Sequence, residues 1–236
     1  MTDKPLGALV SDWTTPVAPG PMTLEGRYCR LEPLSAETHA ALLFNAFVDQ
    51  DELYDYLPAG PFHSAAQYHR WVREVTSDAS SLFFAVYDLR QEAYLGVLSY
   101  LRIAPSAGSI EVGNINFSKA MQRSPVSTEA VYLMMKWAFE AGYRRFEWKC
   151  NALNKPSRQA AQRLGFSYEG IFRQALVVKE RNRDTAWFAM IDKEWPAMKE
   201  AYRVWLDQAN FDAEGKQLER LGDLTGLVRF ASDPTL

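Results

Sequence analysis

The sequence predicts an α/β protein with a mixed sheet, and two patterns carry the prediction. Runs rich in β-branched and aromatic residues alternate along the chain with segments whose apolar residues recur at helical spacing. The expected order is strand, two helices, three strands, helix, strand, helix and two strands, followed by a closing helix. At 236 residues and 47% hydrophobic, the chain can bury a sizeable core, and we expect one enlarged domain.

The first half of the chain predicts four strands and two helices. The first helix follows the capping sequence 35–38, and the second follows Ser64. The second and third strands are separated by a polar turn, so we expect them to pair antiparallel. The four strands are residues 24–34, 82–87, 94–103 and 110–117.

The second half begins with a long predicted helix over residues 125–141, which Gly142 ends because glycine tolerates positive φ. A strand, a short helix that starts near Pro156 and stops at Gly165, and a hairpin with a charged tip follow. The closing helix begins near Lys193. The strands of this half are residues 145–150, 171–179 and 185–191.

The two ends of the chain differ in composition from the middle. Several prolines and a glycine within residues 1–22 predict an extended N-terminal arm, and the central domain is expected to cover residues 23–209. The polar C-terminal extension, residues 210–236, could wrap back on the domain or contact another subunit. These flanking segments, together with exposed aromatic residues, are compatible with a homodimer.

Charge and hydropathy limit the partners. The 26 basic and 29 acidic residues give a net charge of -3, which argues against nucleic acid or an anionic membrane as partner. The N-terminus has no apolar block typical of a signal peptide, and no later run is long enough to span a membrane. We therefore expect a cytoplasmic protein.

Cysteine and histidine residues are few. Cys29 and Cys150 fall in predicted strands, which favours buried free thiols over a disulfide or a catalytic cysteine. His39, His63 and His69 have no partner at the spacing of metal ligands, so we expect no metal site.

Two motifs carry polar groups at helix starts. In the first, a strand over residues 111–118 runs through a loop into the helix that begins near Pro125. Free N–H groups and partial positive charge at a helix N-terminus can hold a phosphate. Residues that could add donors there are Arg123, Ser124, Ser127 and Thr128.

The second motif is Asn154-Lys155-Pro156-Ser157, between a strand and a helix. Polar groups at a helix N-terminus beyond the end of a strand tend to face a ligand. The alternative is that Asn154 and Ser157 only cap the helix.

With the helix start Thr128-Glu129-Ala130 and the ending Leu164-Gly165-Phe166, these motifs closely resemble the GNAT N-acetyltransferase superfamily. The resemblance is to the branch that includes the ribosomal-protein N-terminal acetyltransferases. It covers about residues 24–195 and is strongest over residues 110–192. It implies a mixed, mostly antiparallel sheet flanked by helices, and acetyl transfer from acetyl-CoA to an amine. CoA would lie where two central parallel strands splay apart.

The resemblance also implies a set of CoA-binding residues. The phosphate loop departs from the usual family pattern, because Pro125 removes one amide donor and Ser127 adds bulk where glycine or alanine is common. The hydroxyl groups nearby could replace the lost contacts in part. The implied cofactor-binding residues are Phe117, Gln122, Arg123, Ser124, Val126, Ser127, Thr128, Asn154 and Ser157.

Acetyl transfer to an amine needs a base for the amine and an acid for the departing thiolate. Glu111 is the candidate base, directly or through water, and the alternative is a surface or salt-bridged strand carboxylate. The resemblance implies that Ser157 protonates or hydrogen-bonds the CoA sulfur and that Asn154 holds the pantetheine arm.

The acceptor amine stays open, since a protein N-terminus and a small-molecule amine both suit a fold whose loops set specificity. The resemblance places Tyr54, Tyr56, Phe62 and Tyr68 in the acceptor region, with a core or interface role as the alternative. A non-catalytic acyl-CoA-binding sensor is the rival function, favoured by Pro125 and Ser127. A structural interaction module that uses the two ends of the chain is a third possibility.

Overall fold

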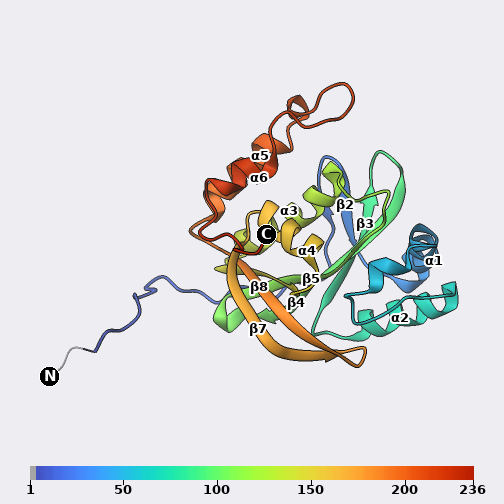
Figure 1. Ribbon diagram of the computed structural model, residues 1–236, viewed down its shortest axis with the longest axis horizontal. Coiled ribbons are helices and arrows are strands. Elements are labelled where there is room, and N and C mark those ends of the chain that lie inside the picture. The colour runs from blue at the N-terminus through green and yellow to red at the C-terminus, as the bar shows by residue number, and fades with distance from the viewer. Residues whose placement is uncertain (1–3) are drawn as a thin grey trace.

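The computed structural model describes residues 4–236 and contains one eight-stranded sheet in the order β1-β2-β3-β4-β5-β6-β8-β7 (Figure 1). Neighbouring strands pair antiparallel except for β5 and β6, which are parallel, so the expected mixed, mostly antiparallel sheet is confirmed. The strands are β1 (Leu24–Glu25), β2 (Cys29–Pro33), β3 (Leu82–Asp88), β4 (Ala93–Ala104), β5 (Ser109–Phe117), β6 (Arg145–Asn151), β7 (Ser167–Val178) and β8 (Arg181–Ile191).

Serine or asparagine caps the four helices that lie nearest the sheet. The side chains of Ser35, Ser64, Ser124 and Asn154 each accept a hydrogen bond from the backbone N–H three residues later. The helices are α1 (Ala36–Phe47), η1 (Asp51–Tyr54), α2 (Ala65–Ser77), η2 (Pro105–Ala107), α3 (Pro125–Glu140), α4 (Lys155–Arg163), α5 (Trp195–Trp205), η3 (Gln208–Asn210) and α6 (Leu221–Gly226).

The strand expected over residues 24–34 is two strands, and this part of the prediction was wrong. A buried carboxylate explains the break, because Glu129 of α3 accepts hydrogen bonds from the backbone N–H groups of Arg27, Tyr28 and Cys29 at 2.6–2.9 Å. Those N–H groups turn toward α3 instead of a neighbouring strand. The resulting turn separates β1 from β2.

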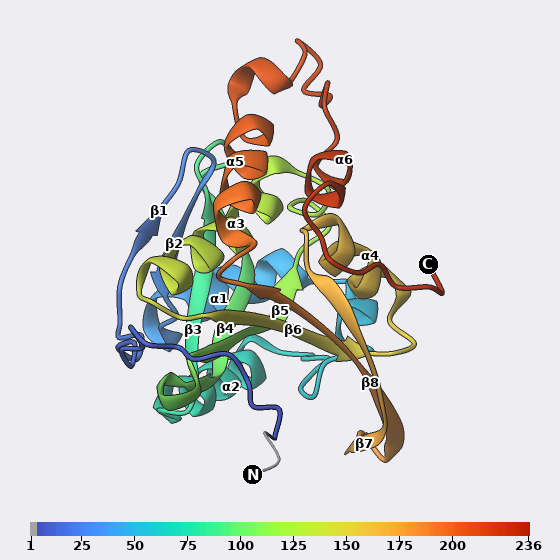
Figure 2. The ribbon, with the colours of Figure 1, turned by 90° about the vertical axis from the view of Figure 1, so that its left-hand side faces the viewer.

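Each face of the sheet buries its own hydrophobic cluster. Ile110 and Val112 of β5 pack with residues of α3 and α5, and the turned view shows α3, α4 and α5 grouped on one side of the sheet (Figure 2). Ala85 and Val97 belong to a second cluster with α1 and α2. Because alternate residues of a strand face opposite sides, Glu111 lies on the α1–α2 face.

The parallel pair β5–β6 stays paired over only part of its length. Pairing runs from Ser109–Arg145 to Val112–Trp148, although β5 continues to Phe117 and β6 to Asn151. A bulge lies just beyond this point, where Asn114, with φ of 49°, and Ile115 together oppose Leu98 of β4. The bulge bends β5 away from β6, and the expected splay of the central parallel strands is confirmed.

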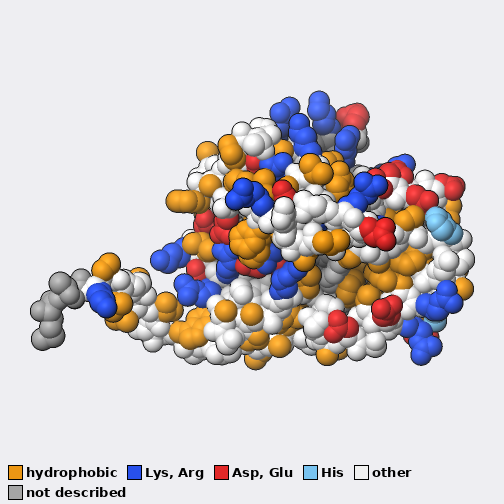
Figure 3. Space-filling view, turned by 60° about the horizontal axis from the view of Figure 1, so that its bottom comes forward, with side chains coloured by type: hydrophobic (Ala, Val, Ile, Leu, Met, Phe, Trp, Pro, Cys, Tyr) orange, Lys and Arg blue, Asp and Glu red, His pale blue; other side chains and the backbone are white. Residues whose placement is uncertain are grey.

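The N-terminal arm leaves the body of the protein and exposes hydrophobic side chains along its length (Figure 3). Leu6 and Leu9 are almost fully exposed, whereas Trp13 lies over Gly108 and beside the Arg144 guanidinium. None of the helices within residues 4–236 is long and apolar enough to span a membrane. The domain limits at 22/23 and 209/210 and the cytoplasmic location stay predictions.

The C-terminal extension wraps back onto α4 and the start of β7. Asp233 pairs with the buried Arg158 of α4, and the carbonyl oxygen of Ala231 accepts from the N–H of Tyr168. One of the two placements expected for this segment, contact with its own domain, is therefore confirmed. Cys29 and Cys150 are buried free thiols, as expected, and burial raises the pKa of both.

Candidate functional site

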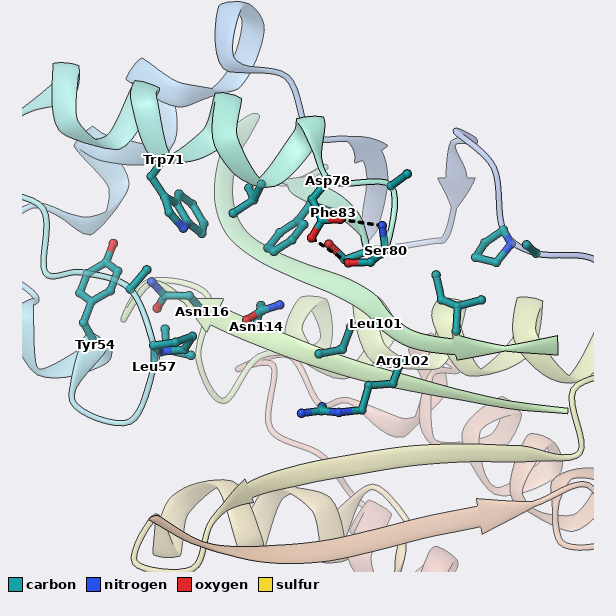
Figure 4. A pocket seen from close by; sticks show the side chains of 18 of the residues that line it. Tyr54, Leu57, Trp71, Asp78, Ser80, Phe83, Leu101, Arg102, Asn114 and Asn116 are labelled. Atoms are coloured by element: carbon teal, nitrogen blue, oxygen red, sulfur yellow. Dashed lines mark hydrogen bonds between the residues drawn. The ribbon is translucent and has the colours of Figure 1, made fainter. Parts of the chain in front are cut away.

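A pocket of about 710 Å³ lies between α2 and the strands β4 and β5 (Figure 4). Trp71 enters from α2 on one side, and Asn114 and Asn116 enter from β5 on the other. The pocket therefore opens on the α1–α2 face of the sheet, beside the point where β5 leaves β6.

Aromatic side chains form one wall of this pocket. The ring of Phe62 lies 5.5 Å from Tyr54 and 5.3 Å from Trp71, whose ring lies 6.0 Å from Phe83. The Phe62–Tyr54 and Trp71–Phe83 pairs pack edge to face and the Phe62–Trp71 pair is tilted, and such ring packing gives the wall a fixed shape. Burial raises the pKa of Tyr54 to about 12, and the neighbouring Asn116 side chain opposes the shift, so the hydroxyl stays protonated at neutral pH.

The predicted acceptor aromatics divide into three groups. Tyr54 and Phe62 line the pocket. Tyr68 is buried in the α1–α2 cluster, as the alternative core reading expected. The Tyr56 hydroxyl donates to the carbonyl oxygen of Leu153 at 3.4 Å, between β6 and α4.

Glu111 is buried on the same face, with 2% of its surface exposed. Arg102 Nη1 donates to its Oε1 at 2.7 Å, and Lys149 Nζ lies 3.0 Å from Oε2. Lys149 forms an ion pair with Oε2, and Arg102 donates the hydrogen bond that Oε1 accepts. Burial raises the pKa of Glu111, and the two cations oppose the rise.

Glu111 is one end of a ladder of charges across β5, β6 and β7. Lys149 also contacts Glu147 at 2.6 Å, Glu147 pairs with Arg145, and Arg145 binds Glu169 through both terminal nitrogens. Lys149 Nζ lies 3.8 Å from the ring centre of Trp187, a cation–π contact. Arg145 thus holds Glu169 of β7 at the other end of the ladder.

On the opposite face, the start of α4 brings Asn154 and Ser157 together. Asn154 Oδ1 accepts from the Ser157 N–H at 3.1 Å, which is the capping contact. Ser157 Oγ accepts from Trp148 Nε1 at 3.1 Å. Because the indole can only donate, the Ser157 hydroxyl keeps its own proton for another acceptor.

The loop before α3 presents backbone donors. Within the described part of the chain, the N–H groups of Arg123, Ser124 and Val126 have no protein acceptor. Arg123 adopts φ of 57° and is exposed. Pro125 occupies the first helical position, where its missing N–H removes a group that would in any case be unpaired within the helix.

The other predicted phosphate-loop side chains are already bonded within the protein. Ser124 Oγ donates to the Met121 carbonyl oxygen at 2.6 Å, and Ser127 Oγ donates to that of Ser124 at 2.9 Å. The buried Thr128 accepts from Arg163, and Gln122 Nε2 donates to the Phe117 carbonyl oxygen. The backbone therefore supplies most of the free donors of this loop.

Three contacts tie the η1 region to its surroundings. Glu52 pairs with Lys119 of the phosphate loop at 2.6 Å, and Gln50 Oε1 accepts from the Lys119 N–H. Lys179, at the tip of the β7–β8 hairpin, donates to the Tyr54 carbonyl oxygen at 2.8 Å. The hairpin tip thus contacts the η1 region, whose Tyr54 lines the pocket.

Sequence reasoning missed Arg102 and Lys149. Lys149 and Glu147 lie two residues apart in a strand, so their side chains face the same side of the sheet. This spacing of opposite charges is the sequence signal that could have indicated an ion pair on that face. Arg102 gave no such signal, since its position depends on a bulge in β4. Within residues 4–236, no cluster of three or more His, Cys, Asp or Glu side chains is placed to hold a metal ion.

Comparison with known proteins agrees with this geometry. The family described as "Acetyltransferase (GNAT) domain" matches residues 29–167, more than half of the chain. The chain belongs to the GNAT family. The strands β5 and β6, which splay apart, lie within the matched residues. The motifs at the starts of α3 and α4 lie within them too.

Two solved GNAT structures match most of the chain. A GCN5-related N-acetyltransferase from Brucella melitensis is 42% identical with a TM-score of 0.90, over 92% of this chain and 100% of that one. A probable acetyltransferase of the GNAT family from Chromobacterium violaceum is 39% identical with a TM-score of 0.78, over 82% and 98%. These likenesses confirm the GNAT-type fold.

A further relative supports the branch as well. The ribosomal-protein-serine acetyltransferase of Escherichia coli (strain K12) is 29% identical over 102 residues, which is 43% of this chain. The match spans 57% of that enzyme's length. The resemblance to the ribosomal-protein acetyltransferases is thereby confirmed at the level of the branch.

Proposed function

We propose that the protein is an acetyl-CoA-dependent N-acetyltransferase that moves an acetyl group directly to a primary amine. One observation carries the proposal: Glu111 and Ser157 lie on opposite faces of the sheet, beside the point where β5 and β6 separate. A base on the acceptor face and a hydroxyl donor on the other face suit a direct transfer between two substrates.

In this transfer the amine nitrogen forms a bond to the acetyl carbon while the bond from that carbon to sulfur breaks. Glu111 takes the proton that the amine loses, directly or through water. Ser157 gives a proton or a hydrogen bond to the departing thiolate, so that the products are an amide and free CoA. The capping contact from Asn154 holds the start of α4 in place for this step.

Acetyl-CoA fits the residues present in its expected place. The free N–H groups of Arg123, Ser124 and Val126 form a donor set at the start of α3, which suits phosphate oxygens. Phe117, Gln122, Ser127 and Thr128 would support this loop, and Asn154 would contact the pantetheine arm. When bound, acetyl-CoA supplies the activated acetyl group.

The acceptor is a protein N-terminus or a small-molecule amine. The likeness to a ribosomal-protein-serine acetyltransferase supports the former. The pocket of about 710 Å³ supports the latter, because its volume is in the range of small-molecule sites.

The test is release of free CoA thiol from acetyl-CoA in the presence of a panel of amines that includes amino acids and short peptides. We expect turnover with at least one amine and a loss of kcat of about a hundredfold in Glu111→Gln. Glu214→Gln, which changes an exposed loop residue, serves as the matched control. Turnover that is undiminished in Glu111→Gln would refute the assigned base.

A non-catalytic acyl-CoA sensor is the second candidate. The observation in its favour is that both oxygens of Glu111 lie within 3.0 Å of a cation, an arrangement that also suits a purely structural carboxylate. Calorimetric titration with acetyl-CoA separates the two functions. Binding without turnover on any amine supports the sensor, and absence of binding contradicts both proposals.

A further inference from the structure

The acceptor pocket contains one unusual basic residue. Arg102 and Asp78 are the charged side chains that line it. The Asp78 carboxylate is already hydrogen-bonded within its own turn. It accepts from the N–H of Ser80 at 2.8 Å and from the Ser80 hydroxyl at 2.7 Å. Arg102 therefore sets the charge that a molecule in the pocket would meet.

A bulge directs Arg102 into the pocket. Consecutive residues of a regular strand face opposite sides of the sheet, yet Leu101, Arg102 and Ile103 all line this pocket. The register of β4 against β5 shifts between Leu101 and Ala104, and Arg102 adopts φ of 46°, in the left-handed region. Figure 4 shows its side chain running along β5 toward the end of the pocket that holds Asn114 and Leu57.

The Arg102 guanidinium has donors to spare. Of its five N–H groups, one on Nη1 reaches Glu111, and the others have no acceptor among residues 4–236. Half of the side-chain surface is exposed. One guanidinium can thus hold Glu111 and a second planar anion at the same time.

The charges around Arg102 favour an anion at the N–H groups that Glu111 leaves free. Arg183 lies within Coulombic range of Arg102 and Glu111, and it adds to the ladder that ends at Glu169. At the Glu111 end of the ladder, three cations face two carboxylates, which leaves one positive charge in excess beside the pocket. The cations are Arg102, Lys149 and Arg183, and the carboxylates are Glu111 and Glu147.

We propose that the acceptor is a free α-amino acid with an aromatic or large apolar side chain, and that Arg102 determines this specificity. The inference rests on the proposed N-acetyltransferase activity. The aromatic wall of Tyr54, Phe62 and Trp71 receives the side chain, and the spare donors of Arg102 bind the α-carboxylate. The α-amino group, one carbon away from the carboxylate, then lies on the Glu111 side of the guanidinium.

Phenylalanine, phenylalaninamide and a peptide that begins with phenylalanine provide the test, because they share one side chain and differ in the free carboxylate. We expect kcat/KM for phenylalanine to exceed the values for the other two by about 10- to 100-fold, the range for a charge-assisted hydrogen-bonded pair. Glycine should be a poor acceptor because it leaves the aromatic wall empty.

The decisive variant is Arg102→Gln. The ratio of kcat/KM between phenylalanine and its amide should fall to about one, whatever happens to kcat through the loss of the Glu111 contact. Arg102→Lys keeps the charge without the planar fork and should recover part of the ratio. Arg90→Gln, at an exposed turn between β3 and β4, should leave the ratio unchanged. Circular dichroism of each variant reports whether it is folded.

Three outcomes overturn the inference while the proposed function stands. The first is a phenylalanine-to-amide ratio of kcat/KM that is unchanged in Arg102→Gln. The others are equal kcat/KM for phenylalanine and for its amide or the peptide, and turnover only with amines that lack a carboxylate. Binding of phenylalanine, followed by tryptophan fluorescence, is the second measurement. Arg102-dependent binding without thiol release would support the pocket assignment and contradict the proposed transfer. Absence of both binding and turnover with phenylalanine would contradict the inference.

Discussion

Glu111 fits both roles that the sequence suggested for it, a salt-bridged strand carboxylate and a catalytic base. The strand carboxylate is salt-bridged, as one alternative expected, through Arg102 and Lys149. It is also buried and borders the pocket between α2 and β4–β5 through Arg102, which is compatible with the proposed base. Burial raises its pKa toward the range in which a carboxylate accepts a proton efficiently, and the cations limit the rise.

Lys149→Met should move the pH dependence of the reaction. A base works in its deprotonated form, and removing the Lys149 charge raises the pKa of Glu111 further. The acidic limb of kcat/KM should therefore move to higher pH, as measured from pH–rate profiles. Lys193→Met, which changes an exposed residue, should leave the limb in place. A limb that stays unchanged or moves to lower pH in Lys149→Met would contradict Glu111 as the base.

Ser157→Ala tests the other side of the reaction. The variant keeps the backbone N–H that Asn154 caps and removes only the hydroxyl beside Trp148. We expect kcat to fall by about a hundredfold with little change in the affinity for acetyl-CoA, measured by steady-state kinetics and calorimetry. Ser106→Ala, at an exposed position of η2, is the control. An unchanged kcat would leave Ser157 with a capping role alone.

At the scale of elements, the C-terminal extension supports the helix that carries Ser157. Arg158, the next residue of α4, is buried, and Asp233 binds it through Nε at 2.8 Å and through Nη2. Thr235 contacts the same guanidinium. A segment close to the end of the chain thus fixes α4 against the sheet.

Removing this anion should destabilise the fold. Asp233→Ala leaves the Arg158 charge buried without its partner, and we expect a loss of about 3 kcal/mol in the free energy of unfolding, measured with urea. Asp55→Ala, at an exposed position after η1, should change it by less than about 0.5 kcal/mol. A loss in Asp233→Ala no larger than in Asp55→Ala would show that the extension does not support α4.

The sequence predicted which helices and strands are present better than it predicted their first and last residues. Capping residues located the starts of α1 and α2, and periodicity with Gly142 located both ends of α3 to within a residue, because these signals are local. The hairpin after α4 was expected from residue 171, whereas β7 begins at Ser167. Helix α6 was not predicted, since its six residues carry little apolar periodicity and are held by contacts with α4 and α5.

For the whole molecule, only the first part of the N-terminal arm, up to residue 12, should be separable from the fold. Residues 4–12 are exposed, whereas Trp13 packs on Gly108, the Val17 carbonyl oxygen accepts from Tyr143, and Pro19 lines the pocket. Removing residues 2–12 should leave both thiol release and the unfolding midpoint unchanged, and removing residues 2–19 should lower both. Equal effects of the two truncations would contradict this division of the arm.

The homodimer stays a prediction at this scale. Edge strand β7 exposes the apolar side chains of Ile171, Phe172, Leu176 and Val177, which supports an interface there. Sedimentation or light scattering of the intact chain would show the oligomeric state.

The sequence by itself determined the fold class, the two motifs at the starts of α3 and α4, and the candidates Glu111, Asn154 and Ser157. These depend on local spacing, capping and alternation, which a single chain displays directly. Tertiary structure alone decided what surrounds them. Arg102 reaches Glu111 only through a bulge in β4, and Asp233 reaches Arg158 from 75 residues away. Such contacts depend on long-range packing, so no local pattern in the sequence predicts them.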